Sequence, residues 1–228
     1  MISQAYQAAA ELVAPLQAAT GALAASCTAP DGASEYRLAR QICALYEWLA
    51  LARLRHVRPP FDIRTVQVEG AAVAVSEVAE RRLPFCSLLH FRKALALSQP
   101  RVLLVAPLAG HFASLLRGTV ATMLPDHDVY LTDWHNARDV PVSHGPFGFD
   151  DFVGLLMDFL DWFGPGAHVV VNCQPTVATL AAIALMAEDG HPAKPRSMTL
   201  IAGPNDTRIR PTRVDELAVP RWRGSNNI

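Results

Sequence analysis

From residue 101 onward, strand-length apolar runs alternate with longer segments of helical periodicity. The strand-length runs are Arg101–Pro107, Val129–Thr132, His168–Val171 and Ser197–Gly203. Helical patterns fill the intervals at residues 112–123, 149–163 and 176–187. This alternation predicts a mostly parallel sheet with flanking helices. Parallel sheets bind ligands beyond the carboxyl ends of their strands, so we expect functional residues directly after these runs.

The chain before residue 101 is organised differently. Residues 1–58 are alanine-rich and repeat apolar residues at helical spacing, which predicts a helical N-terminal segment ending at Pro59-Pro60. Residues 63–78 alternate with a period of two around Glu69-Gly70, the pattern of a β-hairpin. A short apolar run, Phe85–Phe91, predicts one more strand. We therefore expect domains at 1–58 and 59–217, followed by a polar, unstructured tail at 218–228.

The junction between the strand at 168–171 and the helix at 176–187 carries a cysteine, Cys173. A sharp strand-to-helix turn lifts its residue above the sheet edge, which is the geometry of a nucleophile elbow. The N-terminus of the following helix favours a thiolate. Elbows usually have glycine two residues to either side, whereas this chain has Val171 and Pro175. The pattern alone therefore also fits a small buried cysteine.

Two backbone N–H groups are needed to stabilise the oxyanion of an acyl-transfer reaction. In elbow enzymes one belongs to the residue after the nucleophile, here Gln174, and the other to a loop after an earlier strand. Leu108 is the candidate in that loop, although a plain strand–helix turn at residues 108–111 fits equally well.

Three further residues follow strands and are candidates for lining a substrate cleft. His111 closes the loop that begins at Leu108, and Asp133 and Trp134 follow the strand at 129–132. Structural pairing of Asp133 or Asp139 with Arg138 explains that segment about as well.

Composition and missing motifs argue against several other classes of function. The net charge is −1 without a long basic run, which argues against a nucleic-acid partner. There is no HExxH pair, P-loop or dinucleotide fingerprint, so we expect no metal and no cofactor. No apolar run has the length of a membrane span. The four cysteines form no CxxC pair, which suggests a reduced, cytoplasmic setting.

Several segments together resemble the intracellular polyhydroxyalkanoate depolymerases. They are Val105–His111, Thr132–Val142, Val171–Val177 and Gly203–Arg208, with Pro60–Ile63 and Leu83–Cys86 in the N-terminal part. The resemblance implies an α/β-hydrolase fold and an enzyme that hydrolyses the ester bonds of poly(3-hydroxybutyrate) on cytoplasmic storage granules. It also implies that Cys173 is the nucleophile, forming an acyl-enzyme thioester that water hydrolyses.

The chain departs from this family after Cys173. The triad acid and histidine of elbow hydrolases follow the nucleophile, but here the only downstream histidine is His191, and Asp206 is the candidate acid. We therefore expect an α/β-hydrolase-like fold that is incomplete at the C-terminus, with impaired activity. A sheet edge left unpaired would also favour self-association.

Two other functions are compatible with the same residues. Polyester synthases also use an elbow cysteine, but they resemble G-x-C-x-G there, unlike Val171 and Pro175 in this chain. The second alternative is a non-catalytic protein that binds storage granules through an apolar surface.

Overall fold

The computed structural model describes residues 58–108 and 112–206, together with Arg208, Ile209 and Arg213 and four earlier residues, Pro15, Ala19, Gln41 and Ala44. By its internal contacts the chain divides into two units, Met1–Arg58 and Pro59–Ile228. Pro15, Ala19, Gln41 and Ala44, which belong to the first unit together with Arg58, are helical and exposed. The rest of the predicted helical segment, His111 and the tail at 218–228 lie outside the described residues.

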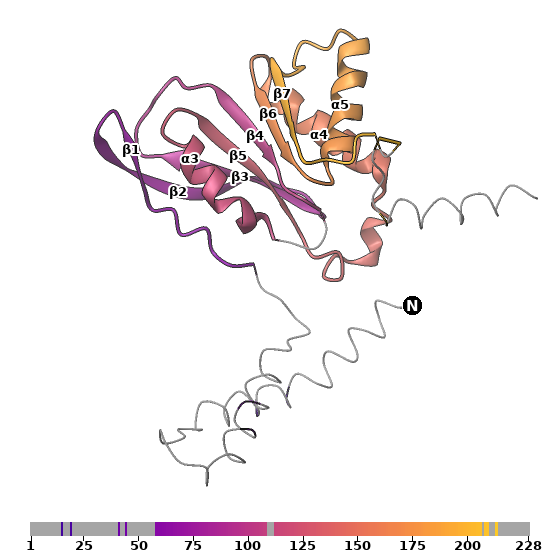
Figure 1. The fold of residues 1–228 in the computed structure, drawn as a ribbon, viewed down its shortest axis with the longest axis horizontal. Helices are drawn as coiled ribbons and strands as arrows, with labels where there is room; N and C mark the ends of the chain where they lie inside the picture. Colours follow the sequence, from indigo (N-terminus) through magenta and orange to yellow (C-terminus); the bar gives the residue numbers. More distant parts are fainter. Residues whose placement is uncertain are drawn as a thin grey trace, which may run out of the picture. The chain divides into compact units, whose positions relative to one another are not determined.

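The second unit is built on a seven-stranded mixed sheet in the order β1-β2-β3-β5-β4-β6-β7 (Figure 1). The strands are β1 (Thr65–Val68), β2 (Ala71–Arg82), β3 (Cys86–Lys93), β4 (Arg101–Val105), β5 (Asp128–Trp134), β6 (His168–Asn172) and β7 (Ser197–Ile201). β5, β4, β6 and β7 pair in parallel, whereas β3 runs antiparallel to β5 and the β1–β2 hairpin continues from it. This is an α/β-hydrolase-like sheet, as predicted.

The central strands are apolar because both faces of the sheet are covered there. β4 (RVLLV) is buried from its second residue to its last, with each of those side chains no more than 1% exposed. A strand buried on both faces is a continuous apolar run instead of an alternating one. β1 and β7 lie at the two ends of the sheet and alternate between more and less buried residues. The core therefore sits around β4, β5 and β6.

Helices connect the parallel strands across both faces. They are the 3₁₀ helix η2 (Ala113–Leu116), α3 (Arg117–Met123), the 3₁₀ helix η3 (Val142–His144), α4 (Phe149–Phe163) and α5 (Thr176–Glu188). The β4–β5 crossover runs in the opposite direction to the β5–β6 and β6–β7 crossovers. Right-handed connections therefore put α3 on one face and α4 and α5 on the other (Figure 1). The direction of the crossovers reverses at β4, so the carboxyl ends of β4 and its neighbours form the expected ligand edge.

One predicted helix differs from the structure. The single helix expected at 112–123 is instead a 3₁₀ turn followed by the short helix α3. Leu115 is 55% exposed, whereas Leu116 and Val120 are buried. A 3₁₀ turn has three residues per turn, so it rotates its side chains relative to an α-helical face. Within the described residues, no helix is long and apolar enough to cross a membrane.

Candidate active site

Cys173 stands at a sharp turn between β6 and α5. Cys173, Gln174 and Pro175 alone connect the two elements. Cys173 has a backbone φ of 66°, in the left-handed region that residues other than glycine rarely adopt. Holding such a residue there costs of order 1–3 kcal/mol and is characteristic of functional sites. Its side chain is exposed, in contrast to Cys86, which is fully buried.

The turn is held by contacts with the neighbouring strand. The backbone N–H of Cys173 donates to the carbonyl oxygen of Ile201 at 2.8 Å, which continues the β6–β7 ladder beyond Asn172. The carbonyl oxygen of Cys173 accepts from the N–H of Thr176 at 3.2 Å. Gly203 packs against Thr176 so closely that a Cβ at 203 would lie 1.7 Å from the threonine Oγ1. The space that elbow glycines usually provide is therefore provided by Gly203.

The two residues expected to form an oxyanion hole follow adjacent strands. Val105 of β4 pairs with Val171 of β6, so the segments that leave these strands begin side by side. Leu108 and Gln174 are both exposed. Neither backbone N–H has an acceptor within the part of the chain that the structure describes. They are therefore available to a ligand at this edge, in addition to the N-terminal end of α5.

Asp133 and Trp134 end β5 and differ in exposure. Trp134 is 9% exposed, stacks on Phe152 at a ring distance of 4.5 Å and donates from Nε1 to the carbonyl oxygen of Ala106 at 2.8 Å. Trp134 thus fixes the segment that leads from β4 to Leu108. Asp133 is partly buried and lies beside Cys86, where burial, and then the negative charge of Asp133, raise the pKa of the buried Cys86 thiol.

No catalytic role was predicted for His135, which lies at the same edge. Its Nδ1 is 2.9 Å from the carbonyl oxygen of Pro84 and its Nε2 is 2.8 Å from Oγ of Ser87. Because a carbonyl oxygen only accepts, Nδ1 carries the proton and Nε2 accepts from the Ser87 hydroxyl. His135 is itself exposed, whereas Ser87 is buried. No sequence pattern links Ser87 with His135; the pairing of β3 with β5 does.

His191 and Asp206, the downstream candidates for a base and an acid, form ion pairs with other residues. His191 lies 3.7 Å from Asp161 near the end of α4, at the edge where β6 and β7 begin, which is opposite to Cys173. Asp206 forms an exposed bidentate ion pair with Arg208 at 2.8 and 2.9 Å, and this pair lowers the pKa of the carboxyl group. Among the described residues, no group of histidine, cysteine and carboxylate side chains is arranged to hold a metal ion.

Comparison with known proteins gives similarities to solved structures alone. No protein-family model matches the chain, and a search of curated proteins finds no match. Naproxen esterase (carboxylesterase NP) from Bacillus subtilis is 14% identical, with a TM-score of 0.45 over 68% of this chain and 51% of that protein. The lipase lip1 from Acinetobacter baumannii AYE is 17% identical, with a TM-score of 0.44 over 66% of this chain and 48% of that protein.

A CIB-like hydrolase from Thermoplasma acidophilum is 11% identical, with a TM-score of 0.38 over 67% of this chain and 82% of that protein. The matched part of the chain spans about half the length of the esterase and of the lipase.

Proposed function

We propose that this chain is a polyester depolymerase that hydrolyses the ester bonds of poly(3-hydroxybutyrate) through Cys173. The observation that carries the proposal is the conformation of Cys173. An exposed cysteine held at a positive φ, between a parallel strand and the N-terminus of a helix, has the geometry of an elbow nucleophile. The motifs that resemble intracellular polyhydroxyalkanoate depolymerases supply the substrate class.

Apolar side chains around this edge support a water-insoluble substrate. Exposed large apolar residues occur on each segment that follows a central strand: Leu108 and Leu115 after β4, Val142 and Phe149 after β5, and Val177 after β6. Val142 is the most exposed of them, at 89%. Exposed apolar groups gathered near one site are typical of binding surfaces. A granule surface or a polyester segment is a suitable occupant.

The proposed reaction has two steps. The Cys173 thiolate attacks the ester carbonyl carbon, the bond from that carbon to the ester oxygen breaks, and the departing oxygen takes a proton to become a hydroxyl. Water then attacks the thioester, which releases a carboxylate and regenerates the cysteine. In each step the backbone N–H groups of Leu108 and Gln174 would donate to the carbonyl oxygen as it gains negative charge.

The group that moves protons is a separate part of the proposal. His111, next to the proposed oxyanion loop, is the candidate from the sequence, and His135 is the candidate from the structure. His135 has a fixed tautomer whose Nε2 can accept a proton. His144, exposed in η3, offers a control position after the same strand.

The test is release of 3-hydroxybutyrate from amorphous polymer granules. We expect Cys173→Ala to lower the rate about 1,000-fold or more, because removing the nucleophile of a triad-type enzyme has effects of that size. Cys86→Ala, which removes a buried thiol, should retain activity. Of His111→Ala and His135→Ala, the variant whose rate falls identifies the base. The rate of His144→Ala should equal that of wild type. Equal rates for wild type and Cys173→Ala would refute the nucleophile. Binding to granules without hydrolysis would support the non-catalytic alternative, and polymer growth from hydroxyacyl thioesters would support the acyltransferase.

A further inference from the structure

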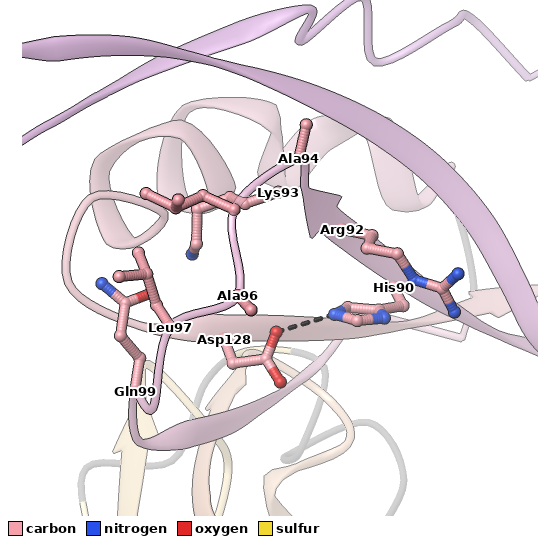
Figure 2. Close-up of a pocket in the computed structure, with 9 residues that line it drawn as sticks. His90, Arg92, Lys93, Ala94, Ala96, Leu97, Gln99 and Asp128 are labelled. Atoms are coloured by element: carbon pink, nitrogen blue, oxygen red, sulfur yellow. Dashed lines mark hydrogen bonds and ion pairs between the residues drawn. The ribbon is translucent and has the colours of Figure 1, made fainter.

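A cavity of about 370 Å³ lies at the sheet edge opposite to Cys173 (Figure 2). It is formed where β3 ends and β5 begins, and the connecting segment to β4 closes it. The lining residues are His90, Arg92, Lys93, Ala94, Leu95, Ala96, Leu97, Gln99 and Asp128. Its volume is in the lower range for small-molecule sites. None of these residues takes part in the proposed hydrolysis.

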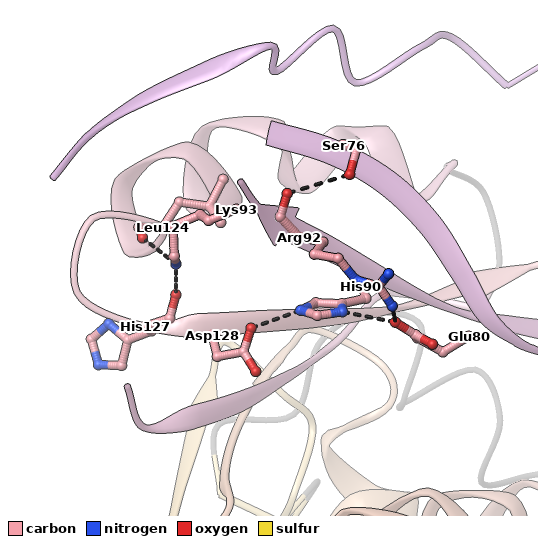
Figure 3. Close-up of polar contacts among 8 residues, drawn as sticks. All are labelled: Ser76, Glu80, His90, Arg92, Lys93, Leu124, His127 and Asp128. Atoms are coloured by element: carbon pink, nitrogen blue, oxygen red, sulfur yellow. Dashed lines mark hydrogen bonds and ion pairs between the residues drawn. The ribbon is translucent and has the colours of Figure 1, made fainter. Parts of the chain in front are cut away.

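One wall of the cavity is a rigid polar network (Figure 3). His90, 8% exposed, lies between two carboxylates, with Nδ1 2.8 Å from Glu80 and Nε2 2.7 Å from Asp128. Carboxylates only accept, so a protonated ring nitrogen of His90 donates to the carboxylate that it faces. Tyr130 stacks on it at 4.1 Å, and Arg92 donates to the same Glu80 oxygen at 2.7 Å. The network joins β2, β3 and β5.

Lys93 makes the opposite wall positive. Its Nζ donates to two carbonyl oxygens, of Leu124 at 2.8 Å and of His127 at 2.6 Å, and an ammonium has a third N–H. Burial lowers the pKa of Lys93, although the nearby Asp128 and Asp126 oppose this. A partly buried cation whose hydrogen-bond partners are neutral carbonyls is stabilised by an anion.

The charges around the cavity favour an anionic ligand. The lining supplies two cations, Arg92 and Lys93, and the carboxylates of Glu80 and Asp128 accept from the polar network. Both carboxylates are already engaged by His90, and Arg92 is 56% exposed at its side chain. A carboxylate group that enters from solvent can therefore contact Arg92 without displacing the network.

Gln99 adds a requirement for a hydrogen-bond donor. Its Nε2 donates to the carbonyl oxygen of Pro125 at 2.8 Å, but its buried Oε1 has no partner among the described residues. Figure 2 shows the Gln99 amide and the Lys93 ammonium on one side of the cavity, and Arg92 and His90 on the other. A ligand ammonium would be repelled by Lys93, whereas a hydroxyl can donate to Gln99. Four apolar residues, 94–97, complete the lining and suit a short alkyl chain.

We propose that this cavity binds a short-chain hydroxycarboxylate. Its carboxylate contacts Arg92, its hydroxyl donates to Oε1 of Gln99, and its alkyl chain lies against residues 94–97. The choice of 3-hydroxybutyrate as the probe rests on the proposed function, because hydrolysis of the polyester releases that compound. The site would then sense product at the edge of the sheet remote from the reaction.

The experiment is calorimetric titration of the Cys173→Ala variant of the full chain with 3-hydroxybutyrate and with butyrate, which lacks the hydroxyl. We expect 3-hydroxybutyrate to bind at least about tenfold more tightly, since leaving a buried acceptor unpaired costs that much or more. Gln99→Leu should lower the affinity for 3-hydroxybutyrate to that for butyrate. The control Gln67→Leu, at an exposed position, should change neither affinity. Arg92→Gln should lower the affinity for both ligands, whereas the control Arg64→Gln should leave both affinities unchanged.

Three results would overturn the inference. They are no binding up to about 10 mM, equal affinities of the two ligands for the unaltered cavity, and a hydroxyl preference that survives in Gln99→Leu. Thermal unfolding of each variant shows whether it is folded. If wild type hydrolyses polymer but 3-hydroxybutyrate does not bind, only this inference is wrong. If 3-hydroxybutyrate binds but wild type has no hydrolytic activity, only the proposed function is wrong.

Discussion

Gly203 and Thr176 are in direct contact across the exit of β7 and the start of α5. A Cβ added at residue 203 would lie 1.7 Å from Oγ1, 2.4 Å from Cβ and 2.5 Å from Cγ2 of Thr176. Thr176 is completely buried, so its side chain has little room to move away. The contact explains how a strand–helix turn flanked by Val171 and Pro175 is nevertheless compact. Its glycine comes from the neighbouring strand.

Gly203→Ala should therefore disturb the turn that carries Cys173. We expect a loss of about 2 kcal/mol in the free energy of unfolding, because an extra methyl group in a packed site costs 1–3 kcal/mol. Hydrolysis should fall as well. Gly154→Ala is the control, since Gly154 lies within α4 with open space around its Cα, and alanine there should be neutral or stabilising. Denaturant unfolding of both variants is the measurement. A Gly203→Ala protein as stable as wild type would show that the contact is not tight.

Thr176 and Thr179 make a second matched pair. Both are buried in α5, but Oγ1 of Thr179 donates to the carbonyl oxygen of Pro175 at 2.8 Å. Oγ1 of Thr176 has no partner among the described residues. We expect Thr179→Ala to lower the free energy of unfolding by about 1–2 kcal/mol and Thr176→Ala to stay within about 0.5 kcal/mol of wild type, because it removes an unpaired hydroxyl. Equal losses in the two variants would contradict this difference.

The parallel half of the fold could be predicted from the sequence because its elements are long or strongly apolar, and the β1–β2 hairpin because its turn has a clear pattern. The pattern at 149–163 gave α4 with its bounds, and the turn at Glu69-Gly70 gave the β1–β2 hairpin. The prediction of a single helix at 112–123 was wrong because helical periodicity does not distinguish an α-helix from a 3₁₀ turn leading into a short helix. Leu115 is exposed for that reason.

Less of the candidate site could be predicted from the sequence, because several of its contacts depend on how the strands pair. Cys173 was found because the strand–helix junction is local, and its positive φ agrees with a strained turn. Its role as a nucleophile stays a prediction. Gly203 and His135 depend on strand pairing, so no spacing in the sequence connects them with Thr176 or Ser87. The polar cluster around His90 likewise assembles residues from three strands.

Acid pH should weaken the network around His90. The hydrogen bond from His90 lowers the pKa of Glu80 below its ordinary 4.5. Burial opposes ionisation of Asp128, but His90 and Lys93 hold its pKa below the ordinary 3.8. A carboxyl group whose pKa is lower in the folded than in the unfolded state stabilises the fold at any pH above its unfolded-state pKa. This stabilisation is lost as the pH falls through the folded-state pKa. The free energy of unfolding should therefore decline below about pH 4.5.

The His90→Gln variant tests the network directly. It should be less stable than wild type at neutral pH by about 1–3 kcal/mol, since glutamine cannot reproduce both of the ring's hydrogen bonds to partly buried carboxylates. Its stability should also change less between pH 6 and pH 3 than that of wild type. His144→Gln, at an exposed histidine, should follow the wild-type pH curve. If the free energy of unfolding fell equally between pH 6 and pH 3 in wild type and His90→Gln, the network around His90 would not be the cause of the decline.

The two described cysteines should differ in reactivity. Cys173 is exposed, whereas Cys86 is fully buried and has a raised pKa because burial disfavours its thiolate. In native protein we expect iodoacetamide to label Cys173 and leave Cys86 unlabelled, as measured by mass spectrometry of the separate peptides. Both should react after denaturation. Labelling of Cys86 at the rate of Cys173 in the native state would contradict the packing of β3 against β5.

Trapping an acyl-enzyme on Cys173 would show whether this cysteine is the nucleophile. Wild-type protein is mixed with a p-nitrophenyl ester of a short-chain acid, quenched in acid within the first turnover and digested for mass spectrometry. We expect a thioester-linked acyl group on the peptide that contains Cys173, absent in Cys173→Ala and present in Cys86→Ala. An acyl group on another residue, or ester hydrolysis that Cys173→Ala carries out as fast as wild type, would contradict it.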